Sequence, residues 1–436
     1  MDELKQIDIA ELADAWSLLG AEDRAEGFRM LDASEAEDFF FDLDARDQAE
    51  LLETLPLTER RRWIRLLPPD DGADLIQAAD EPFRQPLIEL LDEHKRMEVS
   101  ALLAYAEDAA GGLMSSRYAR VRPDMTVDEA IAYLRRQAVA TIEPETIYYV
   151  YVLDSAQRLM GVISFRDLFA SPGNRPVREV MVTDVIAAHE QMDQEEVAQL
   201  FAEHDLLAMP VIDDDRVLKG IVTIDDIVDV VEEEATEDIH KLGGMAALDE
   251  PYMRVGFITL MRKRGGWLVL LFFAQMLTAS VIAGFEEQIA LIAALAIFIP
   301  LILSSGGNSG SQAATLVIRA LTVGEVRLRD WWRVARREMA AGLTLGAVLG
   351  VLGFGRIILG AAFGVDYDTQ TVLLAWVIAA SLLGVVVWGT LVGSMLPFAL
   401  DRLGLDPASA SGPLVATLSD VMGLLIYFSI ARLVIF

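Results

Sequence analysis

Asp420 is the residue of this chain whose position most strongly indicates chemistry. It lies near the middle of the last apolar segment, and neither residues 407–419 before it nor residues 421–431 after it include a charged side chain. A carboxylate at bilayer depth costs at least about 2.5 kcal/mol on the mildest insertion scale, so such residues mark ion or proton pathways. We therefore expect Asp420 to bind a cation inside the membrane.

A second group of candidate ligands lies in the acidic run of residues 225–244, DDIVDVVEEEATEDIHKLGG. Helical spacing would bring its carboxylates within a few turns of one another: Asp226, Asp229, Glu233, Glu234, Glu237 and Asp238. Like charges at three- or four-residue separations weaken an isolated helix by a few tenths of a kcal/mol per pair. A solvated acidic face is the ordinary explanation of such a run. Its position between a cytoplasmic half and a membrane half favours ion binding.

Charge divides the 436 residues into two unlike halves. Residues 1–254 contain 57 acidic and 24 basic side chains, a net charge of −33, whereas the rest of the chain has 10 acidic and 12 basic side chains and carries +2. A half this acidic repels nucleic acid and anionic lipid, which argues against a nucleic-acid partner. Divalent cations are the obvious counter-charge, although an acidic surface that only aids solubility is the simpler alternative.

The ligands that the sequence offers limit the type of metal. The chain has no cysteine, and its four histidines lack the spacing of a zinc site, which leaves ions bound through oxygen. Mg²⁺ gives up water reluctantly and is usually held by one or two carboxylates through retained waters. A single membrane carboxylate per chain fits that habit, and a two-fold dimer would face two Asp420 side chains across its axis.

The second half has the hydropathy of a multi-pass membrane protein, since a span needs about 20 mostly apolar residues. Five segments qualify: residues 265–285, 288–318, 339–365, 369–400 and 407–431. Basic residues precede the first span and follow the second, so the positive-inside rule predicts a cytoplasmic N-terminus and an external C-terminus. Because the chain begins without the basic and apolar regions of a signal peptide, we expect the acidic half to stay in the cytoplasm.

The second span contains a polar, glycine-rich stretch, SSGGNSGSQ, at residues 304–312. Such backbone is tolerated at membrane depth only where it packs against protein or lines a wet cavity. Close helix packing through the small residues is one explanation. The amide groups of Asn308 and Gln312 need hydrogen-bond partners, which favours pore lining.

An internal repeat occupies the cytoplasmic half, with RLMGVISFRDL at residues 158–168 and VLKGIVTIDDI at residues 217–227. The copies share a turn glycine, a β-branched strand, a hydroxyl and a following aspartate: Gly161, Ser164 and Asp167, then Gly220, Thr223 and Asp226. The pattern predicts a β-α-β-β-α unit that occurs twice, and residues 111–232 closely resemble a tandem CBS pair. The resemblance implies a dimerising module that senses ligands, often adenine nucleotides; a passive scaffold is the alternative.

Residues 1–108 have the pattern of short amphipathic helices separated by proline and aspartate, for example residues 47–55, 58–67 and 72–79. A small helical superhelix is expected there. The pattern by itself says nothing about function.

The order of these parts resembles the MgtE-type magnesium channels and transporters over nearly the whole chain. Three motifs carry the resemblance: EEEATEDIHKLGG at residues 232–244, SSGGNSGSQAATLVIRAL at 304–321 and DPASASGPLVATLSDVMGLLIYF at 406–428. The implied domains are a helical N-domain at residues 1–110, CBS domains at 111–174 and 175–232, an acidic connecting (plug) helix at 233–264, and a five-helix α transmembrane domain at 265–436, with the whole multidomain chain forming a homodimer in the lipid bilayer.

That resemblance also implies roles for particular residues. Magnesium ions bound between the plug, CBS and N-domains would hold the cytosolic dimer compact and the pore closed, and the matching positions are Asp205, Asp226, Asp229, Glu234, Glu237 and Asp238. The expected pore residues are Asp420, Ala416, Thr417 and Gly423 on the last span with Asn308 and Gln312 on the second. Small residues about one turn from Asp420 would leave room for a hydrated ion. ATP at the CBS pair is a further expected ligand.

We therefore expect a magnesium channel of the plasma membrane that admits Mg²⁺ to the cytoplasm and is closed by cytoplasmic Mg²⁺. An enzyme is not expected, and the GxxxxGK[ST] loop of a nucleotide-driven pump is absent from the sequence. One alternative is an exchanger of Mg²⁺ or Co²⁺ against H⁺ or Na⁺, since Asp420 could carry a proton. The other is a CBS-regulated membrane scaffold that moves no ion.

Overall fold

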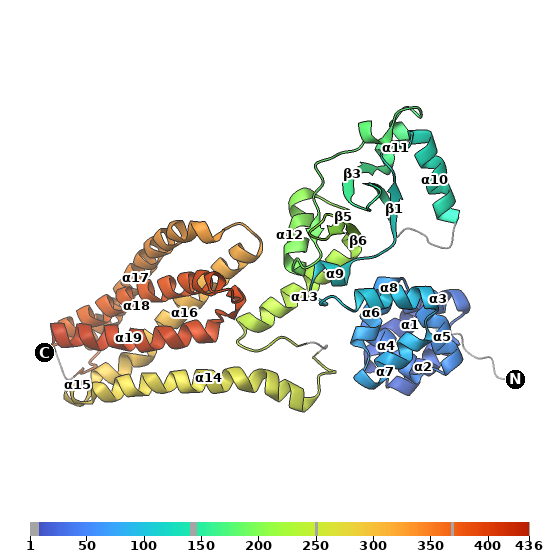
Figure 1. Cartoon of the computed structure of the whole chain (residues 1–436). Helices are drawn as coiled ribbons and strands as arrows, with labels where there is room; N and C mark the ends of the chain where they lie inside the picture. The colour runs from blue at the N-terminus through green and yellow to red at the C-terminus, as the bar shows by residue number, and fades with distance from the viewer. Residues whose placement is uncertain (1–7, 140–145, 249–251, 368–369, 436) are drawn as a thin grey trace. The chain divides into compact units, whose positions relative to one another are not determined.

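The computed structural model describes residues 8–139, 146–248, 252–367 and 370–435 in two compact units, Met1–Val231 and Glu232–Phe436 (Figure 1). The first unit holds a helical domain followed by two small α/β repeats. The second holds the long apolar helices. Each unit is described separately.

The helical domain is built from helices of equal length at a constant period. After α1 (Ile9–Ala15) and the 3₁₀ turn η1 (Trp16–Leu18), each helix is ten residues long: α2 (Ala21–Met30), α3 (Ala33–Asp42), α4 (Ala45–Thr54), α5 (Leu57–Leu66), α6 (Pro69–Ala78), α7 (Glu81–Leu90) and α8 (Glu93–Leu102). Two residues join each of these helices to the next, so the helices begin every twelve residues. The expected helices at 47–55, 58–67 and 72–79 begin one to three residues earlier in the structure.

The two-residue links explain where these helices start and stop. The first link residue is leucine or alanine and packs into the core, as Leu55 and Leu67 do. The second is aspartate or proline; the side chains of Asp32 and Asp92, for example, accept hydrogen bonds from backbone N–H groups in the next first turn. Alternate helices stack, with α4 against α2 and α6, and α6 against α8 (Figure 1). The expected superhelix is confirmed.

The two α/β repeats have the same topology. The first, after α9 (Ala110–Leu113), is β1 (Tyr118–Val121), α10 (Val127–Val139), β2 (Thr146–Leu153), β3 (Leu159–Ser164) and α11 (Phe165–Ala170). The second, after η2 (Val177–Glu179), is β4 (Ala188–His189), α12 (Gln194–His204), β5 (Ala208–Ile212), β6 (Leu218–Thr223) and α13 (Ile224–Leu242). In each sheet the first strand pairs parallel to the second, and the second pairs antiparallel to the third. The expected CBS-like pair is confirmed.

The shared glycines lie within strands rather than in turns, which corrects the sequence interpretation. Gly161 is in β3, where a Cβ atom would lie 2.7 Å from the carbonyl oxygen of Val182, in the segment that leads into the second repeat. Gly220 is in β6, where a Cβ would lie 2.6 Å from the carbonyl oxygen of Ser115, in the segment that leads into the first. Each entry segment therefore hydrogen-bonds to the last strand of the other repeat, and the glycines permit that close backbone approach.

Helix α13 differs from the expected connecting helix at residues 233–264. It begins at Ile224, directly after β6, and ends at Leu242. Gly243 follows, and Gly244 has a positive φ of 72°, as is common just beyond a helix C-terminus. The next described helix, α14, begins at Phe257.

The second unit contains five helices, within its described residues, that are long and apolar enough to cross a membrane: α14 (Phe257–Gly284), α16 (Ala294–Thr322), η3 with α17 (Leu328–Asp330 and Trp331–Ala362), α18 (Thr371–Arg402) and α19 (Gly412–Val434). The expected second span at 288–318 is divided, because a separate helix α15 (Glu286–Leu291) ends where Ile292 adopts an extended backbone. The last span begins at Gly412 rather than 407, after the turn η4 (Pro407–Ser409).

Glycines let the backbones of α16 and α18 come into contact. Cβ atoms at Gly389 and Gly393 of α18 would overlap the carbonyl oxygens of Gly306 and Gly310 of α16. Such close approach through small residues is how helices associate where water supplies no driving force. The packing explanation of the glycine-rich stretch is therefore correct for this face of α16.

We predict that Gly393→Ala destabilises the membrane unit by about 1–3 kcal/mol, the usual cost of overpacking. The added methyl group would overlap the carbonyl oxygen of Gly310, which is part of the backbone of α16 and cannot move without that helix. The matched control is Gly355→Ala, a mid-helix glycine of α17 with open space around it. Thermal unfolding of the purified full-length protein in detergent measures both. Equal melting temperatures for the two variants would contradict the close α16–α18 contact.

Candidate ion-binding sites

Asp420 lies on α19 beside α14. Its Oδ2 is 3.5 Å from Nε2 of Gln275 on α14, the outer limit of a hydrogen bond, and the side chain is half-buried. Its neighbour Ser419 is fully buried, on the face of α19 that packs against Gly306 and Gly310 of α16. Asp420 therefore lies off the packed face, where its carboxylate keeps free ligand positions.

A polar stripe on α16 faces outward from this unit. Ser304, Asn308 and Gln312 recur every four residues and are all exposed, and Asn308 Nδ2 donates to Ser304 Oγ over 3.2 Å. Gly306, Gly307 and Gly310 occupy the opposite, buried face. Polar groups at membrane depth need a protein or a water-filled cavity beside them. The glycine-rich stretch thus serves packing on one face and offers amide and hydroxyl groups on the other.

The remaining expected pore residues lie closer to the packed core. Ala416 is half-buried, with its Cβ in contact with Gly307 of α16. Thr417 is buried, and its hydroxyl donates to the Pro413 carbonyl over 2.8 Å. Gly423 is buried against Val385 of α18. Within this chain the structure groups Asp420 with Gln275, while Thr417 and Gly423 make helix contacts.

The C-terminal part of α13 docks beside the start of α19. Leu242 packs against an apolar cluster of Ala314, Ile318, Ala408, Ala410 and Val415. Lys241 forms ion pairs with both Glu237 and Asp406, and Thr322 donates to Asp238 Oδ2 over 3.3 Å. Burial, with the nearby Asp406 carboxylate, raises the pKa of Asp238. The C-terminal part of α13 is thus held here by the ion pairs of Lys241, one hydrogen bond from Thr322 and the apolar contact of Leu242.

The first unit contains a second group of acids, from two different domains. Asp70, Asp71 and Asp74 of α6 lie in the electrostatic neighbourhood of Asp225 and Asp226 at the start of α13. Burial, together with repulsion from Asp70 and Asp225, raises the pKa of Asp226 to about 8, although a hydrogen bond from the Thr223 hydroxyl opposes the shift. Burial and the same kind of repulsion raise the pKa of Asp71 to about 6 and that of Asp74 well above its usual range. We call these five residues the acid cluster.

Nearby cations only partly offset the charge of the acid cluster, because Lys95 and Arg117 lower the pKa of Asp71 while burial and neighbouring acids raise it to about 6. Oδ1 of Asp70 is buried and makes no hydrogen bond, although buried carboxylates normally do. Among the residues that the structure describes, no three acidic or histidine side chains converge as a ready-made metal site. Mg²⁺ does not need one, because it is commonly held by one or two carboxylates with several waters retained. The cluster could hold a hydrated divalent cation and would be stabilised by it.

The structure brings together only some of the acids expected as sensor ligands. Asp226 lies in the acid cluster, whereas Glu237 and Asp238 lie at the docking site of α13. Asp229 is exposed on α13 and Glu234 is half-buried there. Asp205 is exposed at the C-terminal end of α12, with a left-handed backbone (φ 51°).

Sequence reasoning missed the three acids of α6. The only local signal was the sequence Pro68-Pro69-Asp70-Asp71, which is typical of a helix N-terminus. Acids are common in the first turn of any helix, so this signal did not indicate a site. Which of the N-domain helices lies beside α13 depends on tertiary packing. No local pattern identified α6.

Comparison with known protein families matches the chain along most of its length. The family model described as "Divalent cation transporter" (MgtE) matches residues 299–430, the "MgtE intracellular N domain" model matches residues 7–108, and the CBS domain model matches residues 110–172 and 177–233.

Individual proteins are similar over most of their length. The chain is 47% identical over 369 residues to the magnesium transporter MgtE of Thermus thermophilus, covering 84% of this chain and 79% of that protein. It is 36% identical to the magnesium transporter MgtE of Bacillus subtilis, covering 83% and 77%. Among solved structures, the cytosolic domain of the Mg²⁺ channel MgtE in complex with ATP is 42% identical and covers 52% of this chain and 92% of that one, with a TM-score of 0.47.

The raised pKa values predict how pH affects the first unit when divalent cations are absent. Between about pH 4 and pH 8 the folded protein keeps protons on Asp71 and Asp226 that the unfolded chain releases, so the free energy of unfolding falls as pH rises through this window. One pKa unit corresponds to about 1.4 kcal/mol. We expect Asp226→Asn to remove a few kcal/mol of this dependence.

Urea unfolding of the full-length protein in detergent, with Mg²⁺ chelated, measures the pH dependence. Asp38→Asn, an exposed carboxylate of α3, is the matched control and should keep the wild-type slope. If Asp226→Asn kept that slope too, Asp226 would not be the group with the raised pKa.

Proposed function

Because the chain belongs to the MgtE family of magnesium transporters, we propose that it is a Mg²⁺ channel of the plasma membrane that passes Mg²⁺ into the cytoplasm and closes when cytoplasmic Mg²⁺ is high. The observation that carries the proposal is Asp420, a carboxylate in the middle of a membrane helix, turned away from the packed face and beside Gln275. Such an acid attracts a cation and keeps water around it.

A homodimer supplies the second wall of the pathway. In one protomer the polar stripe of α16 and the Asp420 side chain are accessible from outside. Leaving them against lipid tails would cost several kcal/mol per unsatisfied group. A two-fold axis beside α16 and α19 would instead face two stripes and two Asp420 carboxylates across a wet pore. Two carboxylates with retained waters suit Mg²⁺.

The acid cluster supports closure by cytoplasmic Mg²⁺. A cation between α6 and α13 would offset the burial and the repulsion that raise the pKa of Asp226, so the compact state would bind Mg²⁺ more tightly than a separated state does. When Mg²⁺ falls, the unrelieved repulsion favours separation. The switch needs only this difference in affinity between two states.

Helix α13 connects the sensor to the pore. Its first turn carries Asp225 and Asp226, and its last turn carries Lys241 and Leu242, which contact the transmembrane unit. A movement of the first turn is therefore passed along one continuous helix of 19 residues. In the closed state the plug stays docked on Asp406 and the apolar cluster.

The orientation and a further ligand complete the proposal. Arginines around the α16–α17 loop, with the basic run at residues 262–264 near the start of α14, favour a cytoplasmic N-terminus and an external C-terminus. The paired CBS repeats are the expected site for an adenine nucleotide such as ATP, acting as a regulator rather than as a substrate. No catalytic role is proposed.

A coupled exchanger of Mg²⁺ or Co²⁺ against H⁺ or Na⁺ is the second candidate. The observation that favours it is again Asp420, because a lone carboxylate in the membrane could take up a proton in place of the metal. A channel passes Mg²⁺ whatever the opposing proton or sodium gradient, whereas the flux of an exchanger follows that gradient.

We predict that Asp420→Asn reduces Mg²⁺ flux into proteoliposomes by at least tenfold, because losing one charge contact at the pore costs more than about 1.4 kcal/mol. The control is Glu286→Gln, an exposed carboxylate of the same unit at the start of α15, which should conduct normally. Measuring flux with and without opposing pH and Na⁺ gradients separates channel from exchanger. Wild-type flux through Asp420→Asn would refute the pore role of Asp420, and a wild-type protein that passes no Mg²⁺ would return the molecule to a scaffold role.

We also predict that Asp226→Ala, Asp229→Ala and Glu234→Ala together shift closure to several-fold higher cytoplasmic Mg²⁺, since they remove carboxylates that the ion would stabilise. Single-channel recording in excised patches, with Mg²⁺ titrated on the cytoplasmic face, measures the shift. A control with the same charge change is Glu22→Ala, Glu26→Ala and Asp38→Ala, all exposed on α2 and α3. An unchanged Mg²⁺ midpoint in the sensor variant would refute the switch.

A further inference from the structure

Residues 327–338, at the start of α17, form a basic segment in a chain whose overall charge is −31. The segment contains five arginines, one aspartate and one glutamate, so its own net charge is +3 (five minus two). It includes η3 and the first two turns of α17. All of its arginines are exposed: Arg327, Arg329, Arg333, Arg336 and Arg337. The basic segment therefore presents positive charge to its surroundings.

The first turns of α17 direct this charge away from the protein. Ala335 is buried and marks the packed side of the helix. Because successive residues are about 100° apart around a helix, Arg333 and Arg337 lie about 160° from Ala335, and Arg336 lies about 100° from it. The three guanidinium groups are therefore on the unpacked side of α17.

The arginines are poorly compensated by the chain itself. Arg333 is three and four residues from Arg336 and Arg337, and like charges at these spacings weaken a helix. Asp330 is 3.7 Å from Arg333, but that arginine side chain is 86% exposed, and such a pair is worth little. Arg329 and Arg336 form no ion pair with any residue that the structure describes. An external anion would offset this repulsion.

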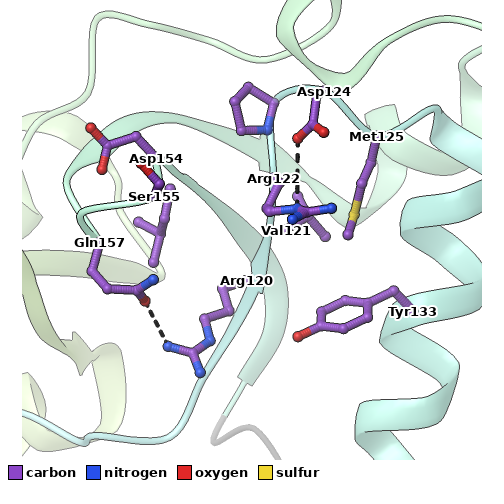
Figure 2. Close-up of a pocket in the computed structure, with 11 residues that line it drawn as sticks. Arg120, Val121, Arg122, Asp124, Met125, Tyr133, Asp154, Ser155 and Gln157 are labelled. Atoms are coloured by element: carbon purple, nitrogen blue, oxygen red, sulfur yellow. Dashed lines mark hydrogen bonds and ion pairs between the residues drawn. The ribbon is translucent and has the colours of Figure 1, made fainter.

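Exposed arginines in the first unit are arranged differently. In the first CBS repeat Arg120 donates to Oε1 of Gln157 over 2.8 Å, and Arg122 meets Asp124 at 3.6 Å (Figure 2). These two arginines therefore have polar partners within their own repeat. The basic segment of α17 is the place where arginines follow one another with few such partners.

Two exposed tryptophans belong to the same segment. Trp331 is 51% exposed and Trp332 is 61% exposed, and their rings meet edge to face with centroids 5.5 Å apart. Trp332 precedes Arg336 by four residues, so the indole and the guanidinium lie on the same side of the helix. Tryptophan is typical of the interface between lipid and water, where its apolar ring and its N–H group are both satisfied.

The depth of the basic segment matches that of lipid headgroups. The 17 residues that follow it, 339–355, contain no charged side chain. They rise about 26 Å along the helix, close to the thickness of about 30 Å of a bilayer's hydrocarbon core. Arg336 and Arg337 thus lie at one edge of that core. Met339 and Leu343 follow on the same side as Arg336 and are both exposed, which offers an apolar surface directly below the arginines.

We propose that the basic segment of α17 binds an anionic phospholipid, of which phosphatidylglycerol is an example. Arg333, Arg336 and Arg337 hold the phosphate, which arginine suits in charge and geometry. The acyl chains lie along Met339 and Leu343. A free anion or an acidic protein surface would account for the arginines, but not for the exposed tryptophans and the apolar surface beside them.

The proposal rests on the membrane location of α17 and not on Mg²⁺ transport. Lipid binding is measured in detergent without any ion flux. Failure of the lipid site would therefore leave the proposed function standing, and failure of transport would leave the lipid site standing.

The test is native mass spectrometry of the full-length protein in detergent, titrated with dioleoyl phosphatidylglycerol or with dioleoyl phosphatidylcholine. The anionic lipid should bind at least about tenfold more tightly than the zwitterionic one, since each basic side chain near an anionic headgroup contributes about fivefold in affinity. Replacing Arg333, Arg336 and Arg337 together by glutamine should remove that preference. The matched control replaces Arg135, Arg175 and Arg178, all exposed in the first unit, by glutamine and should keep it.

Two further measurements separate the lipid from other anions and from misfolding. Inorganic phosphate at the lipid's concentration should not displace phosphatidylglycerol; equal competition would identify a free-anion site and refute the lipid. Without lipid the triple variant of α17 should melt no lower than wild type, because it loses repulsion between like charges. Equal binding of the two lipids by wild type, or an equal loss of phosphatidylglycerol binding in both triple variants, would overturn the proposal.

Discussion

The burial of carboxylates beside one another is the constraint on which the rest of this molecule depends. The first unit places acids of α6 beside the first turn of α13, where burial and mutual charge hold the pKa of Asp226 near 8. A protein without an ionic partner would gain little from such an arrangement, because each buried charge subtracts from a net stability of only about 5–15 kcal/mol. The divalent cation proposed to bind there would turn the same cost into a ligand-dependent stabilisation. The gating proposed for α13 rests on this dependence of stability on the bound cation.

Sequence patterns identified what depends on local chemistry. Asp420 is recognisable because the residues around it are apolar, and the CBS pair because Gly161, Ser164 and Asp167 recur with the same spacing around Gly220. The spans were also found, since hydropathy reports composition and not packing. Their ends were less accurate: the break at Ile292 separates α15 from α16 without any charge or glycine to announce it.

Features that depend on packing between distant segments could not be found in this way. Asp70, Asp71 and Asp74 look like ordinary first-turn acids until α6 is placed beside α13. Gly161 and Gly220 looked like turn residues, although their function is to admit the backbone of an entry segment from the other repeat. The two faces of α16 are a similar case. Its glycines and its amides are interleaved in sequence, and only the helix contacts separate packing from the polar stripe.

The twelve-residue period of the N-terminal domain has a mechanical consequence. Alternate helices stack, so α6 lies between α4 and α8 in one row and is in contact chiefly with those two helices. In a stack of this kind each repeat contacts chiefly its neighbours, and stability is approximately a sum of nearest-neighbour terms. A displacement of the acids of α6 would therefore reach α4 and α8 first, and the rest of the row only through them.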